Sequence, residues 1–315
     1  MADQENHFAP DHLFGHVKDS KQFEVPRIFQ SIDPFHAVHV EGSHAHVSIF
    51  QPFEDFEPIT LVHTGQEAVD KMVEPLDLKL TKFMILEVVA ALVMVAVFVL
   101  LGRKLSGGGR PRGRFVNMFE GLLLFLRDEV ARPAIGRHDA DKFLPFIWTL
   151  FCFILGCNLL GMVPWAGSPT GAFAMTGALA LITFGVVVLA GMSKLGPIGF
   201  WAAQVPHMEL PGPLSIFLKP MIFLIEVAGL LIKHFVLAVR LLANMFAGHL
   251  VLAVLITFIA AAWNIDWGLG IWGVMPASVG AAFALSLLEL FVAFLQAYIF
   301  TFLTSLFIGM AVHPH

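Results

Sequence analysis

The chain is organised around residues 237–250, which read LAVRLLANMFAGHL. They place Arg240 in the middle of an apolar stretch, 213–262. A guanidinium keeps its proton, so within hydrocarbon it needs an acidic partner, water or a route to the interface. The nearest acidic residues along the chain, Glu226 and Asp266, are too distant for a local ion pair. A partner must come from elsewhere in the fold or from another subunit, because an arginine that snorkels from a helix end fits a mid-stretch position poorly.

Composition places the chain among membrane proteins. Its 315 residues are 57% hydrophobic and 14% charged, and the mean hydropathy is +0.78, which is too apolar for a soluble domain. The net charge of −5 is misleading because the acidic residues are segregated, and most of them lie in the first eighty positions. No basic patch of the kind that binds nucleic acid is present. The sequence also lacks a phosphate-binding glycine loop and any cofactor signature, so we expect no cofactor and no metal.

Five apolar segments predict a polytopic all-α membrane protein with about five crossings. They are residues 83–101, 144–163, 172–192, 213–262 and 276–312. The basic residues that follow the first segment, Arg103 and Lys104 among them, assign that loop to the cytoplasm by the positive-inside rule. The amino terminus is then outside and the carboxyl terminus is cytoplasmic. Residues 115–130 alternate apolar and charged side chains, which predicts an amphipathic helix on the cytoplasmic surface that ends near Pro133.

The last two segments are too long for upright spans. A helix over 213–262 would extend about 70 Å, against a hydrocarbon core of about 30 Å. It must either split into two spans or lie strongly tilted, and a split would need a break near Lys233 and His234, where no proline or glycine occurs. We therefore expect a long tilted two-helix hairpin at the C-terminal end, joined by a Trp-rich turn.

The amino-terminal part divides from the rest by composition. Residues 1–80 form an acidic extramembrane segment, and residues 81–315 form the membrane domain. The stretch 35–50 alternates around a central Glu-Gly-Ser and is compatible with a hairpin. Its histidines, at positions 36, 39, 44 and 46, are either a loose metal-binding cluster or, as we favour, solvated side chains. In the second span we interpret Asn158 as a polar residue satisfied by a neighbouring helix.

Polar residues recur at a spacing of seven on both long helices. Glu226, Lys233 and Arg240 form one stripe, with Asn244 one turn beyond, and Glu289 and Gln296 repeat the spacing on the last helix. Polar groups are costly in lipid unless partnered. The stripes therefore face each other, a water path or another subunit. Adhesion between helices is the alternative, and cations together with carboxylates favour an ion path.

Two segments, RLLANMFAGH (240–249) and LELFVAFLQAYIFTFLTSLF (288–307), resemble the signature helices of subunit a of the F-type ATP synthase. That subunit is the membrane stator that passes protons to a rotating c-ring. The resemblance covers roughly the last two-thirds of the chain. It implies a tilted helix pair along the ring, partnership with the c-ring, the b subunits and the rest of the complex, and no bond chemistry in this subunit. The length and the absence of a transit peptide favour a bacterial plasma membrane.

The resemblance also implies roles for individual residues. Arg240 matches the stator arginine, which attracts the ionised c-ring carboxylate and prevents direct leak between two half-channels. Asn244 and Gln296 match polar residues beside that arginine, and Glu226 and Lys233 match a Glu and a Lys of the same helix in bacterial relatives.

A second pair, His249 and Glu289, matches two positions that some bacterial members fill in swapped order. A histidine with a carboxylate partner suits a proton relay, and it favours protons over sodium as the coupling ion. His249 follows Arg240 by nine residues, about 180° around a straight helix, so one residue can face the ring and the other a channel behind it. His234 is either part of the inner channel or, as we favour, interfacial.

Two other classes of function compete with this interpretation. A secondary transporter would show internal repeats and helices broken near the midplane, and we find no repeat. In a purely structural membrane scaffold, Arg240, His249 and Glu289 would only hold helices together, and neutral replacements that preserve packing would be tolerated.

Overall fold

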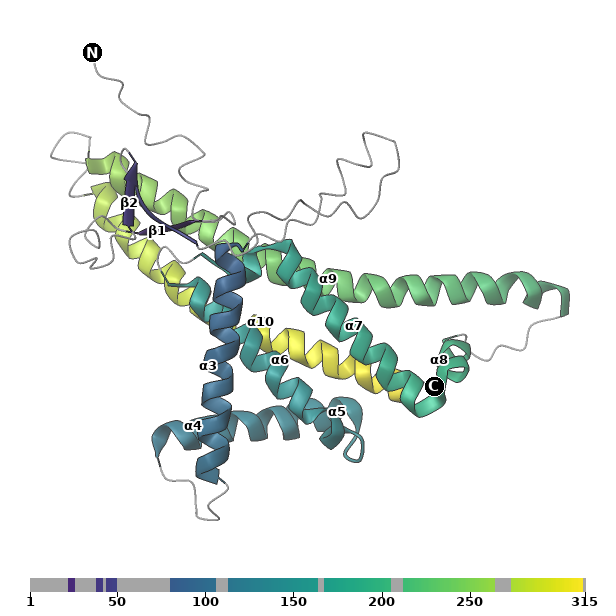
Figure 1. The fold of residues 1–315 in the computed structure, drawn as a ribbon. Helices are drawn as coiled ribbons and strands as arrows, with labels where there is room; N and C mark the ends of the chain where they lie inside the picture. The colour runs from purple at the N-terminus through teal and green to yellow at the C-terminus, as the bar shows by residue number, and fades with distance from the viewer. Residues whose placement is uncertain are drawn as a thin grey trace.

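The protein is a bundle of long helices. A computed structural model describes residues 22–25, 38–41, 44–49, 80–105, 113–163, 167–204, 212–263 and 273–313. Five helices within these ranges are long and apolar enough to cross a membrane. They confirm the five predicted segments and the helical, multi-pass fold class (Figure 1).

Three of the five are of ordinary transmembrane length. They are α3 (Lys82–Leu105), α6 (Ala140–Gly161) and α7 (Phe173–Leu195). Each extends a few residues beyond its predicted cytoplasmic boundary, because the helical hydrogen bonds continue into polar turns that carry residues such as Arg103, Asp141 and Lys194. A short 3-10 turn, Pro169–Gly171, leads into α7, and a helix that the sequence did not indicate, α8 (Pro197–Ala203), follows it.

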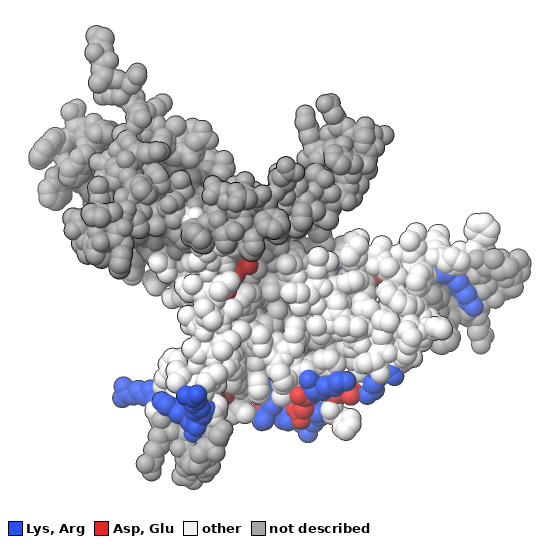
Figure 2. All heavy atoms as spheres, viewed as in Figure 1, with Lys and Arg blue, Asp and Glu red and all other residues white. Residues whose placement is uncertain are grey.

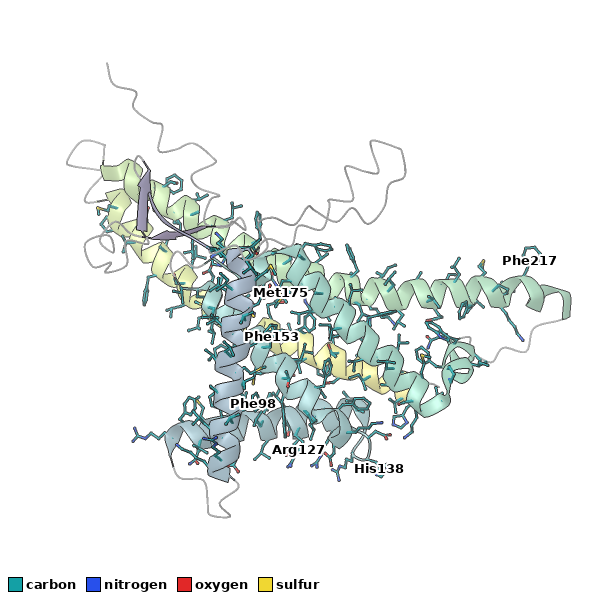
Figure 3. The ribbon with its side chains drawn as sticks, viewed as in Figure 1. Phe98, Arg127, His138, Phe153, Met175 and Phe217 are labelled. Atoms are coloured by element: carbon teal, nitrogen blue, oxygen red, sulfur yellow. The ribbon has the colours of Figure 1, made fainter. Side chains whose placement is uncertain are left out.

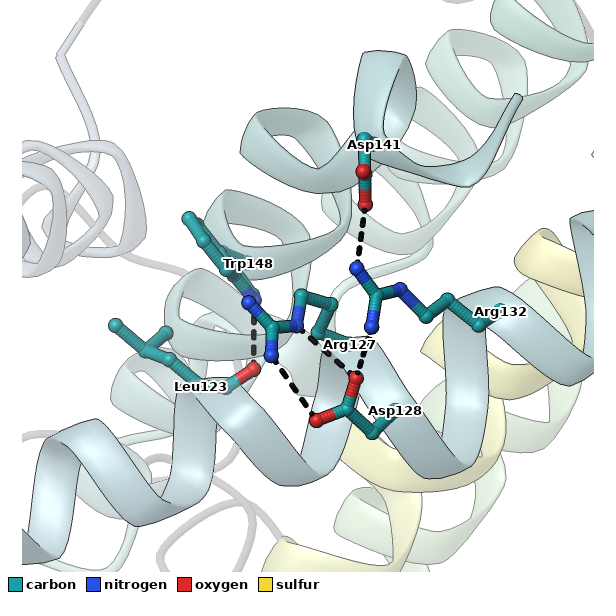
Figure 4. A network of polar contacts seen from close by, with 6 residues as sticks. All are labelled: Leu123, Arg127, Asp128, Arg132, Asp141 and Trp148. Atoms are coloured by element: carbon teal, nitrogen blue, oxygen red, sulfur yellow. Dashed lines mark hydrogen bonds and ion pairs between the residues drawn. The ribbon is translucent and has the colours of Figure 1, made fainter. Parts of the chain in front are cut away.

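The predicted amphipathic helix exists, with a π turn inside it. It consists of α4 (Arg114–Phe125), the π turn Leu126–Ala131 and α5 (Arg132–Ile135). Pro133 does not end it, because the proline stands at the start of α5; the helix ends at Gly136, whose φ of 98° suits glycine. At the π turn the Trp148 indole of α6 donates to the Leu123 carbonyl at 3.1 Å (Figure 4).

Ion pairs connect charged residues within this surface helix and join the helix to α6. The guanidinium of Arg127 donates to Asp128 at 3.0 Å, and Arg132 contacts both Asp128, at 2.7 Å, and Asp141 of α6, at 3.4 Å (Figure 4). The hydrogen bond from Arg127 holds the pKa of the Asp128 carboxyl below its usual range. The carboxylates are exposed and the arginines are half-buried, so these ion pairs orient the helix more than they stabilise it.

The two remaining helices form the predicted hairpin. They are α9 (Gly212–Trp263), with 52 residues, and α10 (Met275–Val312), with 38. α9 continues through Lys233 and His234, so the alternative of two separate spans is wrong. Figure 1 shows α9 and α10 lying across the direction of α3, as expected for strongly tilted helices, with α9 changing direction partway.

The core lies where α6, α7 and α10 meet the π turn and α9. One cluster centres on Leu126, Ile154 and Phe300, and a second on Ile147, Val187 and Ile308. Close approach depends on small residues: a Cβ at Gly309 of α10 would collide with the Ala134 carbonyl oxygen of α5. Figure 3 shows the side chains of these helices, with Phe98 on α3 and Phe153 on α6.

A small sheet lies in the amino-terminal segment. The strands β2 (Val38–Glu41) and β3 (His44–Ser48) pair antiparallel with His39 opposite His46, which confirms the hairpin. β1 (Gln22–Val25) pairs with the other edge of β3, so the order is β1-β3-β2. His36 lies outside the described residues, and the metal-binding alternative stays a prediction.

Candidate functional site

The site is built where the Glu289 side chain of α10 packs against Gly248 of α9. A Cβ at Gly248 of α9 would lie 2.5 Å from Oε1 of Glu289 and 3.2 Å from its Cδ. Glycine is therefore required for the Glu289 carboxyl to pack against the backbone of α9. The helices are antiparallel (Figure 1). At 1.5 Å per residue, this contact sets Arg240 level with residue 297, about 12 Å further along, and so beside Gln296.

Arg240 is half-buried and has no acidic partner in the described part of the chain. Its Nε and Nη2 atoms are both buried without a hydrogen-bond acceptor, and none of the ion pairs among the described residues includes it. An unpaired guanidinium is costly in a low-dielectric setting, so the arrangement requires an acceptor from outside the described residues or from water. The neighbours on its helix, Leu237, Ala238 and Leu241, are buried and fix the base of the side chain.

His249 and Glu289 lie at the same level of the two helices. His249 directly follows Gly248, against which Glu289 packs. The Nε2 atom of His249 and the Oε1 atom of Glu289 are buried and unpartnered, and among the described residues no hydrogen bond joins them. The structure thus brings a titratable base and a titratable acid to one level of the hairpin, each with a free proton-binding atom.

The two polar residues near Arg240, Gln296 on α10 and Asn244 on α9, differ in burial. Gln296 is 5% exposed and lies on the face of α10 that also buries Ala293, Ala297 and Phe300, whereas Asn244 is half-buried on α9. Glu289 precedes Ala293 by four residues and therefore shares this inward face. The polar stripe on α10 thus points into the bundle.

Asn158 is structural, as predicted. Its Nδ2 donates to the Ala293 carbonyl of α10 at 3.3 Å, and its Oδ1 accepts from Thr170 at 2.8 Å. Ser168 and Thr170 share a further hydrogen bond of 2.9 Å. All three side chains are buried, and each of them makes a hydrogen bond within the cluster.

A separate cavity of 240 Å³ lies near the other end of the hairpin. Glu226 and Lys233 of α9 line it, together with Gln204 at the end of α8 and His313 at the end of α10. Lys233 precedes Arg240 by seven residues, about 10 Å along α9. The predicted stripe therefore runs from this cavity toward the arginine, while His249 and Glu289 lie beyond the arginine on the other side.

His234 is not interfacial. It is 2% exposed, and its Nδ1 atom lies 2.9 Å from the Leu230 carbonyl. Its ring packs between Phe184 of α7 and Phe307 of α10. The distances between ring centroids are 5.3 Å and 5.0 Å, respectively. The residue is buried because α9 turns this face, rather than that of Lys233, toward the neighbouring helices.

A cluster of charged side chains joins the ends of three helices beside the cavity. Both carboxylate oxygens of Asp139 accept from Lys194 of α7 at 2.9 Å, and His313 lies 3.3 Å from the same carboxylate. The hydrogen bond from Lys194 holds the pKa of Asp139 below its usual range. Asp139 therefore joins the start of α6 to the ends of α7 and α10.

Sequence reasoning missed three contributors to these sites: Gly248, Gln204 and His313. Gly248 stands directly before His249, and a glycine inside a long helix signals close approach of another element. No pattern in the sequence marks Gln204 or His313, because their place in the cavity depends on how α8 and α10 end.

Known proteins resemble this chain over most of its length. The family described as ATP synthase A chain matches residues 84–309. ATP synthase subunit a of Myxococcus xanthus is 42% identical over 254 residues, which are 80% of each chain. The subunit a of Chloroherpeton thalassium is 37% identical over 82% of this chain and 73% of its own, and a subunit a of Prosthecochloris aestuarii is 35% identical over 87% and 82%.

These matches agree with the two signature segments and with the five apolar helices. They make the chain a multi-pass membrane component of an ATP synthase. The protein belongs to the ATP synthase A chain family.

Proposed function

We propose that this subunit conducts protons between the two sides of the membrane and the c-ring, with Arg240 as the stator arginine. The observation that carries the proposal is the unpaired guanidinium: Nε and Nη2 are buried without an acceptor in the described residues. A carboxylate on a neighbouring subunit supplies the missing charge, and the arginine favours the ionised form of that carboxylate. The subunit itself performs no bond chemistry.

Two separate polar sites on either side of Arg240 support two half-channels. The pair His249 and Glu289 serves the outer one, where free proton-binding atoms lie level with each other. Glu226 and Lys233 serve the inner one, where they line a cavity of 240 Å³. Protons cannot pass directly between the sites, because the fixed positive charge of Arg240 stands between them. They must instead travel on the ring.

An apolar surface beside Arg240 fits a ring of transmembrane helices. Along α9 the side chains of Val236, Val239 and Phe246 remain exposed, and on α10 so does Phe291. In this family's complex such a face would contact the c-ring, with Asn244 and Gln296 as polar neighbours of the arginine. The b subunits and the remaining subunits complete the partnership, and the bilayer covers what is left.

The distribution of charge supports an orientation. Figure 2 shows most of the visible Lys and Arg side chains along one edge, where α3 ends and α6 begins, below an apolar body. By the positive-inside rule this edge is cytoplasmic. The carboxyl terminus is then cytoplasmic, residues 1–80 form an extramembrane segment outside, and residues 81–315 form the membrane domain of a bacterial plasma-membrane protein.

The test is Arg240→Ala in the complete ATP synthase, in inverted membrane vesicles. ATP-driven proton pumping should vanish while the complex stays assembled, because an uncharged side chain no longer draws the ring carboxylate into its ionised form. Passive proton leak should rise after the catalytic head is stripped off.

The matched control is Lys219→Ala, which removes an exposed cation of the same helix far from the hairpin contact. This variant should pump normally. Normal pumping by an assembled Arg240→Ala complex would refute the proposal and leave Arg240 as a structural residue.

A further inference from the structure

His313 occupies the mouth of the inner cavity. It is the residue after the last turn of α10, where its backbone N–H still bonds to the Gly309 carbonyl at 2.9 Å. Its side chain is 57% exposed and also lines the cavity that contains Glu226 and Lys233. One imidazole therefore touches both the aqueous side and the interior of the cavity.

His313 lies beside a carboxylate while its ring stays accessible. Nε2 lies 3.3 Å from the Asp139 carboxylate, and the residue stands at the C-terminal end of α10, which is the negative end of the helix dipole. The other charged groups of the surroundings are Lys194, which holds Asp139 through both oxygens, and Glu226 and Lys233 across the cavity. His138 lies next to Asp139 on the turn between α5 and α6 and does not line the cavity (Figure 3). The carboxylate is thus positioned by one cation and free to stabilise a second.

The rate at which protons reach the cavity can limit turnover, and an imidazole at its mouth can raise that rate. At about pH 7.5 free protons are about 3 × 10⁻⁸ M, so an encounter rate constant of about 10¹⁰ M⁻¹s⁻¹ delivers only about 300 protons per second. Turnover rates of about 1–10³ s⁻¹ lie in the same range. Because imidazole changes charge between about pH 5 and 8, it can take protons from buffer acids, which are far more abundant than free protons.

We propose that His313 is a proton-carrying residue of the inner half-channel, which exchanges protons between cytoplasmic buffer and the cavity; this rests on the proposed function. A protonated buffer molecule gives its proton to the imidazole, and the imidazolium is held by the Asp139 carboxylate. The imidazolium then releases a proton to water in the cavity, which passes it toward the Glu226 carboxylate. The ring returns to its neutral form, and no charge is left behind.

The experiment uses inverted vesicles that carry the complete ATP synthase with His313→Gln, where the cytoplasmic face is outside. Glutamine keeps hydrogen-bonding capacity but carries no exchangeable charge. In weakly buffered medium ATP-driven pumping should fall by about threefold, toward the rate at which free protons alone arrive. Added imidazole should restore it, because a diffusible buffer then delivers protons to the cavity directly.

The matched control is His138→Gln, an exposed histidine on the turn between α5 and α6 that does not line the cavity. It should pump as the unaltered complex does at every buffer concentration. A His313→Gln complex that pumps normally in weak buffer would overturn the inference. So would a loss of pumping that imidazole does not relieve, because it would indicate a structural role. Either result leaves the proposed function standing, since that depends on Arg240→Ala.

Discussion

Two groups of polar side chains lie inside this helical bundle, and they differ in whether their polar atoms have hydrogen-bond partners. Asn158, Ser168 and Thr170 satisfy one another and the Ala293 carbonyl, within one enclosed cluster. Arg240 and Glu289 instead carry buried atoms that find no partner among the described residues. The first group stabilises the fold, whereas the second costs free energy unless a group outside the described residues completes it. The contrast supports the proposed functional roles of Arg240 and Glu289 independently of any relative.

The largest effect that can sharpen this contrast is expected from Glu289→Gln. The amide has the shape of the carboxyl group that packs on Gly248, so the stability of the complex should stay unchanged. Pumping should fall on the order of 100-fold, because an amide cannot accept and release protons in this pH range. Proton pumping and thermal unfolding of the same preparation measure the two quantities. A stability loss with normal pumping would move Glu289 into the structural group.

A medium effect of the opposite kind is expected from Asn158→Leu. It removes the acceptor of the Thr170 hydroxyl and the donor to Ala293, which should lower the free energy of unfolding by about 1–2 kcal/mol. Pumping per assembled complex should not change. Thr149→Val is the control, because that hydroxyl bonds only to the Pro145 carbonyl of its own helix, at 2.7 Å. Equal losses in both variants would contradict a special role for the enclosed cluster.

The smallest effect concerns the charged cluster at the helix ends, where Asp139→Asn is the informative change. Lys194 lowers the pKa of Asp139 from its usual 3.8, so folding gains stability above that value and loses it as the pH falls through the lowered pKa. The unaltered protein should therefore lose stability below about pH 4, and the variant should lose less over that range. The difference should be small and should shrink with salt, because the Lys194 partner is exposed. Thermal unfolding at acid and neutral pH, at two salt concentrations, measures it.

The sequence predicted the helices well because their signal is periodic and long. Each of the five spans is a run of apolar residues, and even the tilt of α9 follows from its length against the thickness of a bilayer. The stripe of Glu226, Lys233 and Arg240 could also be predicted, since a spacing of seven fixes one face of a helix.

Contacts between distant helices could not be predicted in this way. The burial of His234 depends on Phe184 and Phe307, which lie on two other helices. The place of His313 in the cavity likewise depends on where α10 ends relative to α8. Such facts need three-dimensional register, and Gly248 was a local sign of it between α9 and α10.

The π turn of the surface helix has a consequence for comparing relatives. Its buried residues recur at intervals of five, as Leu126 and Ala131 do, and again Val130 and Ile135. In a regular α-helix positions four apart share a face, so one residue fewer in this turn would leave the same faces buried. The length of the chain at this point is therefore free to vary by one. We therefore expect a single-residue gap in an alignment of subunits a to fall between positions 126 and 131, where it conserves packing on both sides.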